Sequence, residues 1–505
     1  MVPAGGRRWR GGTAGRSARG RRAAPRRIGT RSRRLMLSTQ IRPARARSLR
    51  SFRADATKVE ERPDDRLSYL DQALFLGLRA TGQAAVMQCV WVYEHAVDFE
   101  GLRRFHHNFG YGLAGRRIEP SPLPFGRHRW VSSLGPPSSL DIEQTPRPRA
   151  ELSDWIDEHA QLPVDPQWGP AWHMGVLPMT DGSTAISLVG SHCIGDGGGA
   201  LLTVFNAVTG NTPDLGYPMP GERTRMRGLA ADARQTVRDA PEIGRTLVAA
   251  AKLAYRKRKD FARKGKGAVE TPLRDEHVVV PSVTLFVDGD EWDARAAALG
   301  GNSYSLLAGF GATLSERMGR QQPGDGFVPF IIPINDRTLE DTRANAVKLA
   351  NARIDPRGVT EDLAPARAAI KQALKTMREE PDETLALLPL TPFIPRRAVK
   401  STADVAFGFS DLPVSCSNLG DLPPDIGRID GSDAEYVILR GVDQFIPRSV
   451  LEQRRGLLTV IGARVGHKMM IAVIAYQPGA TNTKPHLREL TTAALGDFGL
   501  TPAVI

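Results

Sequence analysis

The sequence has few cysteines and no long apolar run. Its three cysteines, Cys89, Cys193 and Cys416, are widely separated among 505 residues and odd in number, which argues against a disulfide framework. Reduced thiols fit a cytoplasmic setting, and we expect the protein to be cytoplasmic. No uncharged apolar stretch reaches the roughly 18 residues that a transmembrane helix needs. The start of the chain also lacks the apolar segment of a secretory signal, so neither feature is expected.

Acidic residues are scarce in one part of the chain. Residues 1–60 hold 18 Lys and Arg against two acids, whereas residues 61–505 hold 50 basic and 53 acidic residues. The formal net charge of +13 therefore comes from an Arg-rich tail, and the body carries no excess of base that would indicate specific nucleic-acid binding. The tail has too few apolar residues to fold, and we expect it to be disordered. Its origin stays open: an upstream start ahead of Met36, an arm for anionic surfaces, or a transit-like leader.

Strands and helices mix in a similar way in two blocks of residues 61–505, which predicts an α+β (α/β sandwich) protein. We expect an N-terminal half at 61–215, a linker with a crossover helix at 216–275 and a C-terminal half at 276–505. Strands are expected at 84–94, 127–133, 326–337 and 412–420, with a hairpin at 456–478, and helices at 66–80, 98–110, 149–160, 198–208, 242–267, 302–319 and 361–379.

The crossover helix carries the second concentration of base. Between Arg245 and Lys266 there are nine Lys and Arg and a single acid, Asp260. A solvated helix would explain this pattern. Peripheral contact with an anionic membrane would explain it too, because each base near the headgroups contributes on the order of 1 kcal/mol. Both interpretations stay open.

One short stretch, LVGSHCIGDGGGALL at 188–202, has the composition of a functional loop. The dipeptide Asp181-Gly182 ahead of it is typical of a tight hairpin turn, so the strand that ends at His192 should be antiparallel to its predecessor. Asp196 follows among glycines. We expect these glycines to allow positive φ, so that the carboxylate turns back into the protein while the imidazole faces a cleft. A catalytic base is one interpretation of His192.

Three other interpretations of this loop compete. Four of its residues fit the G-x-G-x-x-G/A pattern of a dinucleotide cradle, but an antiparallel strand and the negative charge of Asp196 count against it. A metal corner would use His192, Cys193 and Asp196. Neighbouring strand residues point to opposite faces, however, and no second His or Cys cluster stands at ligand spacing, so no metal is expected. The last interpretation is a buried, hydrogen-bonded histidine in an ordinary turn.

His192, Asp196 and Gly197 form the pattern H-x-x-x-D-G. It resembles the signature of the CoA-dependent acyltransferase superfamily, which includes chloramphenicol acetyltransferase, peptide-synthetase condensation domains, mycobacterial polyketide-associated acyltransferases and bacterial wax ester synthase/diacylglycerol acyltransferases. The likeness covers roughly residues 66–500.

Four further segments carry this resemblance. LSYLDQALFL looks like the family's LSxxDxxFL, and IPINDR occupies the place of PVSVR, with Arg337 on its arginine. RANAVKLANARID resembles GNxxxxxxxxLP, with Asn345 on its asparagine, and SCSNLG resembles SNLG, with Asn418 on its asparagine. The chain departs from the pattern at Ser191, where many members have a histidine, and at Ser303, where the wax ester synthase branch has an aspartate.

The resemblance implies two chloramphenicol-acetyltransferase-like halves with a tunnel between them. His192 would be the general base that takes the proton of a hydroxyl acceptor as it attacks an acyl-CoA thioester. Asp196 would form a structural, bidentate pair with Arg337, and exchanging these two charges would partly rescue each single change. Gly197 would complete the motif. Asn418 would donate to the developing oxyanion or bond only within its own turn.

The expected function is therefore that of an O-acyltransferase of lipid metabolism, similar to wax ester synthases and diacylglycerol acyltransferases. Its partners would be acyl-CoA and a hydroxylated acceptor, and no cofactor is implied because acyl-CoA is a substrate. Two alternatives stay open. One is condensation of carrier-protein thioesters to an ester or amide, with an acyl carrier protein as partner. The other is a non-catalytic member of the same fold that binds a lipid or a carrier protein.

Overall fold

The computed structural model describes residues 64–264, 276–320, 325–338, 340–380, 385–394 and 412–505. The Arg-rich tail at 1–60 lies outside these residues, as does the segment 265–275 of the crossover. Among the helices that are described, none combines the length and the apolar character needed to cross a bilayer.

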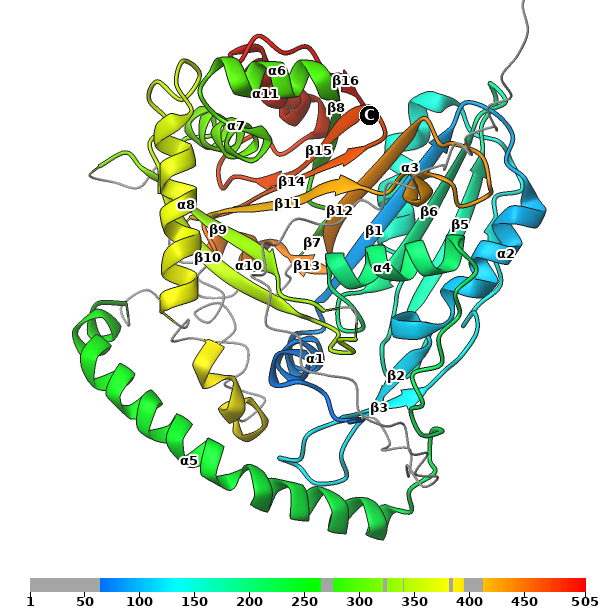
Figure 1. Cartoon of the computed structure of the whole chain (residues 1–505), viewed down its shortest axis with the longest axis vertical. Coiled ribbons are helices and arrows are strands. Elements are labelled where there is room, and N and C mark those ends of the chain that lie inside the picture. The colour runs from blue at the N-terminus through cyan, green and yellow to red at the C-terminus, as the bar shows by residue number, and fades with distance from the viewer. Residues whose placement is uncertain (1–63, 265–275, 321–324, 339, 381–384, 395–411) are drawn as a thin grey trace, which may run out of the picture. The chain divides into compact units, whose positions relative to one another are not determined.

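Two mixed β-sheets organise the described residues (Figure 1). The first has the order β12-β1-β6-β5-β4. Its strands are β1 (Ala84–Tyr93), β4 (Asp141–Ile142), β5 (Trp172–Pro178), β6 (Thr184–Ser191) and β12 (Tyr436–Gln444). β5 and β6 pair in antiparallel fashion and Gly182 has a φ of +86°, which confirms the predicted hairpin at Asp181-Gly182.

The second sheet has the order β10-β9-β11-β14-β15-β8-β16. Its strands are β8 (Ser282–Asp288), β9 (Val328–Asn335), β10 (Val347–Ile354), β11 (Val414–Leu422), β14 (Leu457–Val465), β15 (Lys468–Tyr476) and β16 (Ala503–Val504). β11 is parallel to both of its neighbours, β9 and β14, while the other pairs are antiparallel. Two short antiparallel pairs accompany the sheets: β2 (Arg116–Glu119) with β3 (Arg129–Ser132), and β7 (His277–Val278) with β13 (Ile446–Pro447).

Strand β12 comes from the C-terminal part of the chain but lies in the first sheet (Figure 1). It pairs with β1 along almost its whole length, from Ala84 opposite Gln444 to Val92 opposite Tyr436. β1 is thereby a central strand, flanked by β12 on one side and by β6 on the other. Residues at the end of β12 are in this way brought beside the loop that follows β6.

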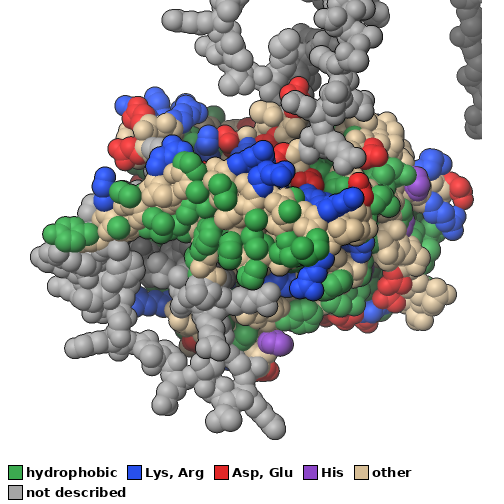
Figure 2. Space-filling view, turned by 90° about the horizontal axis from the view of Figure 1, so that it is seen from below, with side chains coloured by type: hydrophobic (Ala, Val, Ile, Leu, Met, Phe, Trp, Pro, Cys, Tyr) green, Lys and Arg blue, Asp and Glu red, His purple; other side chains and the backbone are tan. Residues whose placement is uncertain are grey.

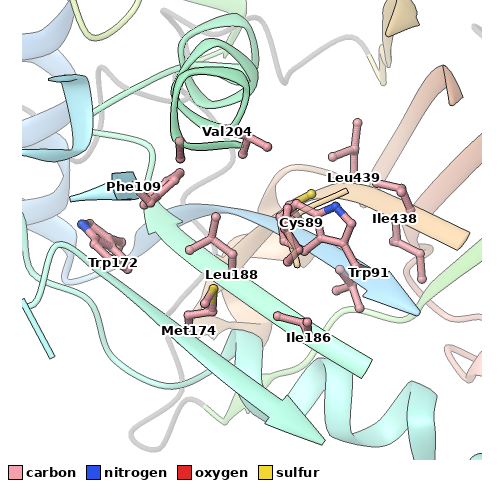
Figure 3. Packing of buried hydrophobic residues seen from close by; sticks show 14 of the residues in the cluster. Cys89, Trp91, Phe109, Trp172, Met174, Ile186, Leu188, Val204, Ile438 and Leu439 are labelled. Atoms are coloured by element: carbon pink, nitrogen blue, oxygen red, sulfur yellow. The ribbon is translucent and has the colours of Figure 1, made fainter. Parts of the chain in front are cut away.

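Helices cover both sheets. They are α1 (Tyr69–Thr81), α2 (Phe99–Phe109), α3 (Leu152–Ala160), α4 (Gly197–Val208), α6 (Gly289–Ala298), α7 (Ser303–Arg317), α8 (Ala364–Glu379), α10 (Arg448–Gln453) and α11 (Lys484–Gly496). On the first sheet, Trp91, Leu188 and Val204 gather in the core beneath α2 and α4 (Figure 3). On the opposite face, Gln88 of β1 donates a hydrogen bond to the carbonyl of Ile156 in α3.

The crossover is a single helix, α5 (Arg225–Lys264), which runs along the lower edge of the molecule in Figure 1. It begins well before the predicted residue 242 and passes through Pro241 without ending. A proline removes one helical hydrogen bond. Because the helix continues through Pro241, contacts with the rest of the protein help to hold this part of it. Asp239, two residues before the proline, accepts a hydrogen bond from Gln235 and lies 3.9 Å from Arg127.

Candidate functional site

His192 stands directly after β6 and continues its pairing with β1. The register places Val86 opposite Ser191, and the amide of His192 donates to the carbonyl of Ala85 at 2.9 Å. The carbonyl of His192 accepts a hydrogen bond from Asn345 Nδ2 at 3.1 Å. The residue is partly exposed, while its Nδ1 atom is buried and has no hydrogen-bond partner among the described residues. The backbone of His192 is therefore fixed on both sides, and its ring reaches the surface in part.

Asp196 is turned away from His192 and into the protein, with 2% of its surface exposed. It is the N-cap of α4, because Oδ1 accepts from the amide of Gly199 at 2.7 Å. Oδ2 accepts from the amide of Ala346 at 2.7 Å. The amide of Asp196 itself donates to the carbonyl of Ala344 at 2.9 Å. One carboxylate thus joins the loop after β6 to a segment 150 residues further along the chain.

Arg337 meets Asp196, although not as the predicted bidentate pair. Only one hydrogen bond joins them, from Nη2 to Oδ1 at 3.1 Å, and the two side chains are 4% and 3% exposed. Nη1 also donates to the backbone carbonyls of Asp341 and Arg343, and Nη2 to that of Ala344, while Nε has no partner among the described residues. The bidentate expectation was wrong because Oδ2 of Asp196 is already occupied by the amide of Ala346. Arg337 therefore closes the turn between β9 and β10 as much as it neutralises the carboxylate.

The glycines of the loop have a different purpose from the predicted one. None of those at positions 195 and 197–199 adopts a positive φ, so the expectation of left-handed backbone was wrong. Instead, distant residues approach them closely. A Cβ on Gly198 would lie 3.2 Å from the Asn335 amide group, and one on Gly199 would lie 3.1 Å from Arg337 Nη2. The missing side chains let the two halves meet at this loop.

The segment Ala344–Ala346 links three parts of the site. Asp71 of α1, which is fully buried, accepts hydrogen bonds from the amides of Ala344 and Asn345 and from Asn345 Nδ2. Ser68 is the N-cap of α1, since its side chain accepts from the amide of Asp71. Asp71, Asp196 and the carbonyl of His192 are consequently held by one strand connection.

Arg116 of β2 supports the same loop and was not singled out in the sequence. It is fully buried, its Nη2 donates to the carbonyl of Ile194 at 3.1 Å, and its guanidinium lies 3.9 Å from the centroid of the Trp130 ring. Burial lowers the pKa of its guanidinium. A lone Arg in a strand gives no sequence signal of this role, because its partners are backbone carbonyls and an aromatic face.

The contacts of two other candidate residues do not indicate a catalytic role. Asn418 of β11 accepts from the amide of Gly420 at 2.9 Å, which is the turn-bonding alternative. Cys193 is buried, and burial raises the pKa of its thiol to about 12. A thiol that stays protonated is a poor nucleophile and a poor metal ligand. Within the described part of the chain, no three His, Cys, Asp or Glu side chains lie close enough together to hold a metal ion.

Asp443 of β12 is a site residue that the sequence reasoning missed. It is opposite Ala85 in the β1–β12 register, and Ala85 binds the amide of His192 on its other side. Burial raises the pKa of the Asp443 carboxyl, and the positive charges of Arg454 and His192 oppose that rise. Because the charge of His192 affects the pKa of the Asp443 carboxyl, the two side chains share one electrostatic environment.

No protein-family model and no curated protein matches the sequence. Solved structures do match it in three dimensions. The first condensation domain of the CDA synthetase has 12% sequence identity and a TM-score of 0.50, and the match covers 87% of this chain and 99% of that one. The first condensation domain of the calcium-dependent antibiotic synthetase, in complex with a substrate analogue, has 13% identity and a TM-score of 0.51, with the same coverage. The chain has a condensation-domain fold.

The condensation-domain fold confirms the predicted α+β class with its two chloramphenicol-acetyltransferase-like halves. The tunnel between the halves stays a prediction. A cavity of about 530 Å³ opens beside α3 and the start of α11, and its lining includes Asp157, Val279 and Lys484 and not His192. The candidate site is therefore defined by the contacts of His192, Asp196 and Arg337 described above.

Proposed function

We propose that the chain is an acyltransferase in which His192 is the general base. The observation that carries this proposal is the placement of a partly exposed imidazole on a backbone that is held at its amide by Ala85 and at its carbonyl by Asn345. Such anchoring fixes the main chain from which the imidazole projects, and positioned general-base catalysis contributes on the order of 10²–10⁴ in rate. Asp196 and Arg337 have a structural role in this proposal, because their polar atoms face the junction of the two halves.

The chemistry needs only one proton acceptor. Nδ1 of His192 is buried, which leaves Nε2 as the nitrogen for substrate. Nε2 takes the proton of the acceptor hydroxyl as its oxygen forms a bond to the thioester carbonyl carbon. When the tetrahedral intermediate collapses, the C–S bond breaks and the departing thiolate receives the proton from the imidazolium. The products are an ester and a free thiol, with no acyl-enzyme.

The donor and the acceptor that we propose are an acyl-CoA and a hydroxyl compound, as in enzymes similar to wax ester synthases and diacylglycerol acyltransferases. The second candidate is condensation on carrier-protein thioesters, with which the condensation-domain fold is equally compatible. Both candidates use the same base and differ in what delivers the acyl group.

Release of free thiol tests the proposed function. The full chain, incubated with acyl-CoAs of several lengths and a panel of alcohols, should release thiol at a rate that depends on both substrates. Acyl groups on a phosphopantetheinyl carrier protein, added in competition, distinguish the two donors. A chain that releases no thiol from either donor with any alcohol or amine would favour the binding member of the fold instead.

We further propose that this cytoplasmic protein touches an anionic membrane through the outer face of α5. Along this face run exposed apolar side chains separated by whole helical turns, with Met226 75%, Val237 73% and Tyr255 67% exposed. Beside them lies a row of exposed bases: Arg227, Arg234, Arg238, Arg245 and Lys252. Hydrophobic and basic side chains gather together on the face seen in Figure 2, which is the side of α5.

Three acids of α5 bond to side chains of the protein, and one of them, the exposed Glu242, accepts from Tyr69 Oη at 3.4 Å. Asp232 accepts hydrogen bonds from Ser121 and Arg223, and Asp239 accepts one from Gln235. An apolar stripe flanked only by bases is the pattern of an interfacial helix at anionic lipid. A second copy of this face would be repelled by the like charges.

Removal of two bases should weaken this contact. Arg234→Gln with Arg238→Gln should reduce binding to vesicles of phosphatidylcholine and phosphatidylglycerol roughly 30-fold, at about 1 kcal/mol for each base. Co-sedimentation measures the fraction of each protein that is bound to the vesicles. The matched control is Lys371→Gln with Arg378→Gln on the exposed side of α8, which should bind as the parent does. Equal binding to vesicles of phosphatidylcholine alone would contradict the charge argument.

A further inference from the structure

Three residues form one row across the first sheet, next to the proposed base. The backbone pairings place Ala85 of β1 between His192 on one side and Asp443 of β12 on the other. Residues opposite one another in a sheet point to the same face. The next residues of this face along the strands are Gly190 and Gly441, on either side of Met87. Two glycines and the side chain of Met87 therefore border the row.

The row is open at its centre. Ala85 is exposed, although it lies in a central strand between the buried residues Ala84 and Val86. His192 and Asp443 are both partly exposed. Two strand spacings separate the Cα atoms of these two residues by about 10 Å, and the exposed Ala85 is the residue between them in the register. The pairing therefore directs the imidazole and the carboxyl to the same face of the sheet, on either side of an exposed residue.

No described residue donates a hydrogen bond to the carboxyl of Asp443. Burial raises the pKa of this carboxyl. Arg454, at the C-terminal end of α10, and His192 supply the charges that act on it. Because Asp443 is partly exposed and no described residue donates to it, its carboxyl oxygens are available to accept a hydrogen bond from a substrate.

We propose that Asp443 binds a second hydroxyl of the acceptor, adjacent to the hydroxyl whose proton His192 takes. The inference rests on the proposed function and narrows its acceptor class to vicinal diols and polyols. One hydroxyl donates to the imidazole and its neighbour donates to the carboxyl, so the two hydrogen bonds fix the reacting oxygen over Ala85. A simple fatty alcohol would place a methylene group against the carboxyl and leave it unsatisfied.

Paired acceptors test this assignment. The full chain, with one acyl-CoA, should use the vicinal dodecanediol with a kcat/KM about tenfold or more above that for dodecanol, because a hydrogen bond to a carboxylate contributes that much to recognition. Asp443→Ala should remove this preference, so that kcat/KM for the diol becomes equal to that for dodecanol, because the variant lacks the carboxyl that recognises the second hydroxyl. Asp421→Asn, which alters an exposed carboxylate of β11, is the matched control and should keep the preference.

The preference should also depend on pH. As pH rises through the pKa of Asp443, the carboxylate forms and its hydrogen bond to the diol strengthens, so the diol-to-alcohol ratio of kcat/KM increases. Effects of pH that act on both acceptors alike cancel in this ratio. In Asp443→Asn the ratio should be independent of pH, which a merely structural role of Asp443 would not produce.

The outcomes separate the two proposals. If Asp443→Ala lowers kcat/KM equally for both acceptors, or leaves the diol preference unchanged, the proposed role of Asp443 is wrong. The proposed transferase function is not affected by either result. If the parent chain transfers to neither acceptor, and also to no other alcohol, the proposed function itself fails. A second measurement covers a folding defect: Asp443→Asn should unfold at a higher temperature than the parent at pH 7. The difference should narrow as the pH falls through the raised pKa, since the folded parent then keeps its proton without cost.

Discussion

His192→Ala should abolish acyl transfer and leave the protein folded. Without an imidazole, the acceptor has to lose its proton to water, and almost none of an alcohol is alkoxide at neutral pH. We expect kcat to fall about 10²–10⁴-fold, the range that a positioned general base contributes. Thiol release at saturating acyl-CoA measures it. The fold should survive because both anchors of residue 192 use its backbone: the amide to Ala85 and the carbonyl from Asn345.

The neighbouring residue supplies the control. Cys193→Ala changes a buried thiol whose pKa is raised by burial to about 12, so it should keep near-parental turnover. Unfolding by heat should begin within a few degrees of the parent for both variants. Unchanged turnover in His192→Ala would remove this residue as the base, and loss of activity in Cys193→Ala alone would point to thiol chemistry.

Features that depend on near neighbours in the sequence could be predicted. Asp181-Gly182 requires a tight turn, so the antiparallel strand leading to His192 follows from two residues. The capping of α1 by Ser68 is equally local. Asp196 at the start of an apolar helix is a recognisable N-cap, and the resemblance to a known family pointed to Arg337 across 141 residues.

Features that depend on distant backbone could not be predicted in this way. Asp443 reaches the site only because β12 pairs with β1, and the pattern of alternation within β12 does not say which sheet it will join. The glycines of the loop were identified correctly as special. Their reason, the approach of Asn335 and Arg337 from the other half, is invisible in the local sequence. The three carbonyl partners of Arg337 are hidden for the same reason.

Asp196→Asn should cost both stability and activity. The substitution removes the charge opposite Arg337 and leaves a guanidinium that is 4% exposed without its carboxylate. Breaking a buried ion pair on one side costs about 3–5 kcal/mol. The new amide NH₂ must also face either the Gly199 or the Ala346 amide, which are both donors. Urea unfolding should give a clearly lower midpoint, and thiol release should fall because the loop that carries His192 is displaced.

The exposed carboxylate of Asp421 gives the matched comparison for this variant. Its pair with Arg464 is 3.4 Å long and 87% of its side chain is exposed, so Asp421→Asn should change the free energy of unfolding by less than about 0.5 kcal/mol. If Asp196→Asn lost activity at full stability, Asp196 would act on the chemistry rather than on the structure.

Exchanging the two charges should not restore what the single changes remove, contrary to the expectation from sequence. A carboxylate at position 337 would face the carbonyls of Asp341, Arg343 and Ala344, which offer it no hydrogen. A guanidinium at position 196 would face the amides of Gly199 and Ala346, which are donors as well. We therefore expect Asp196→Arg with Arg337→Asp to unfold at a lower urea concentration than either single variant. A double variant more stable than both would mean that attraction between the two charges, and not their separate hydrogen bonds to backbone, holds the halves together at this loop.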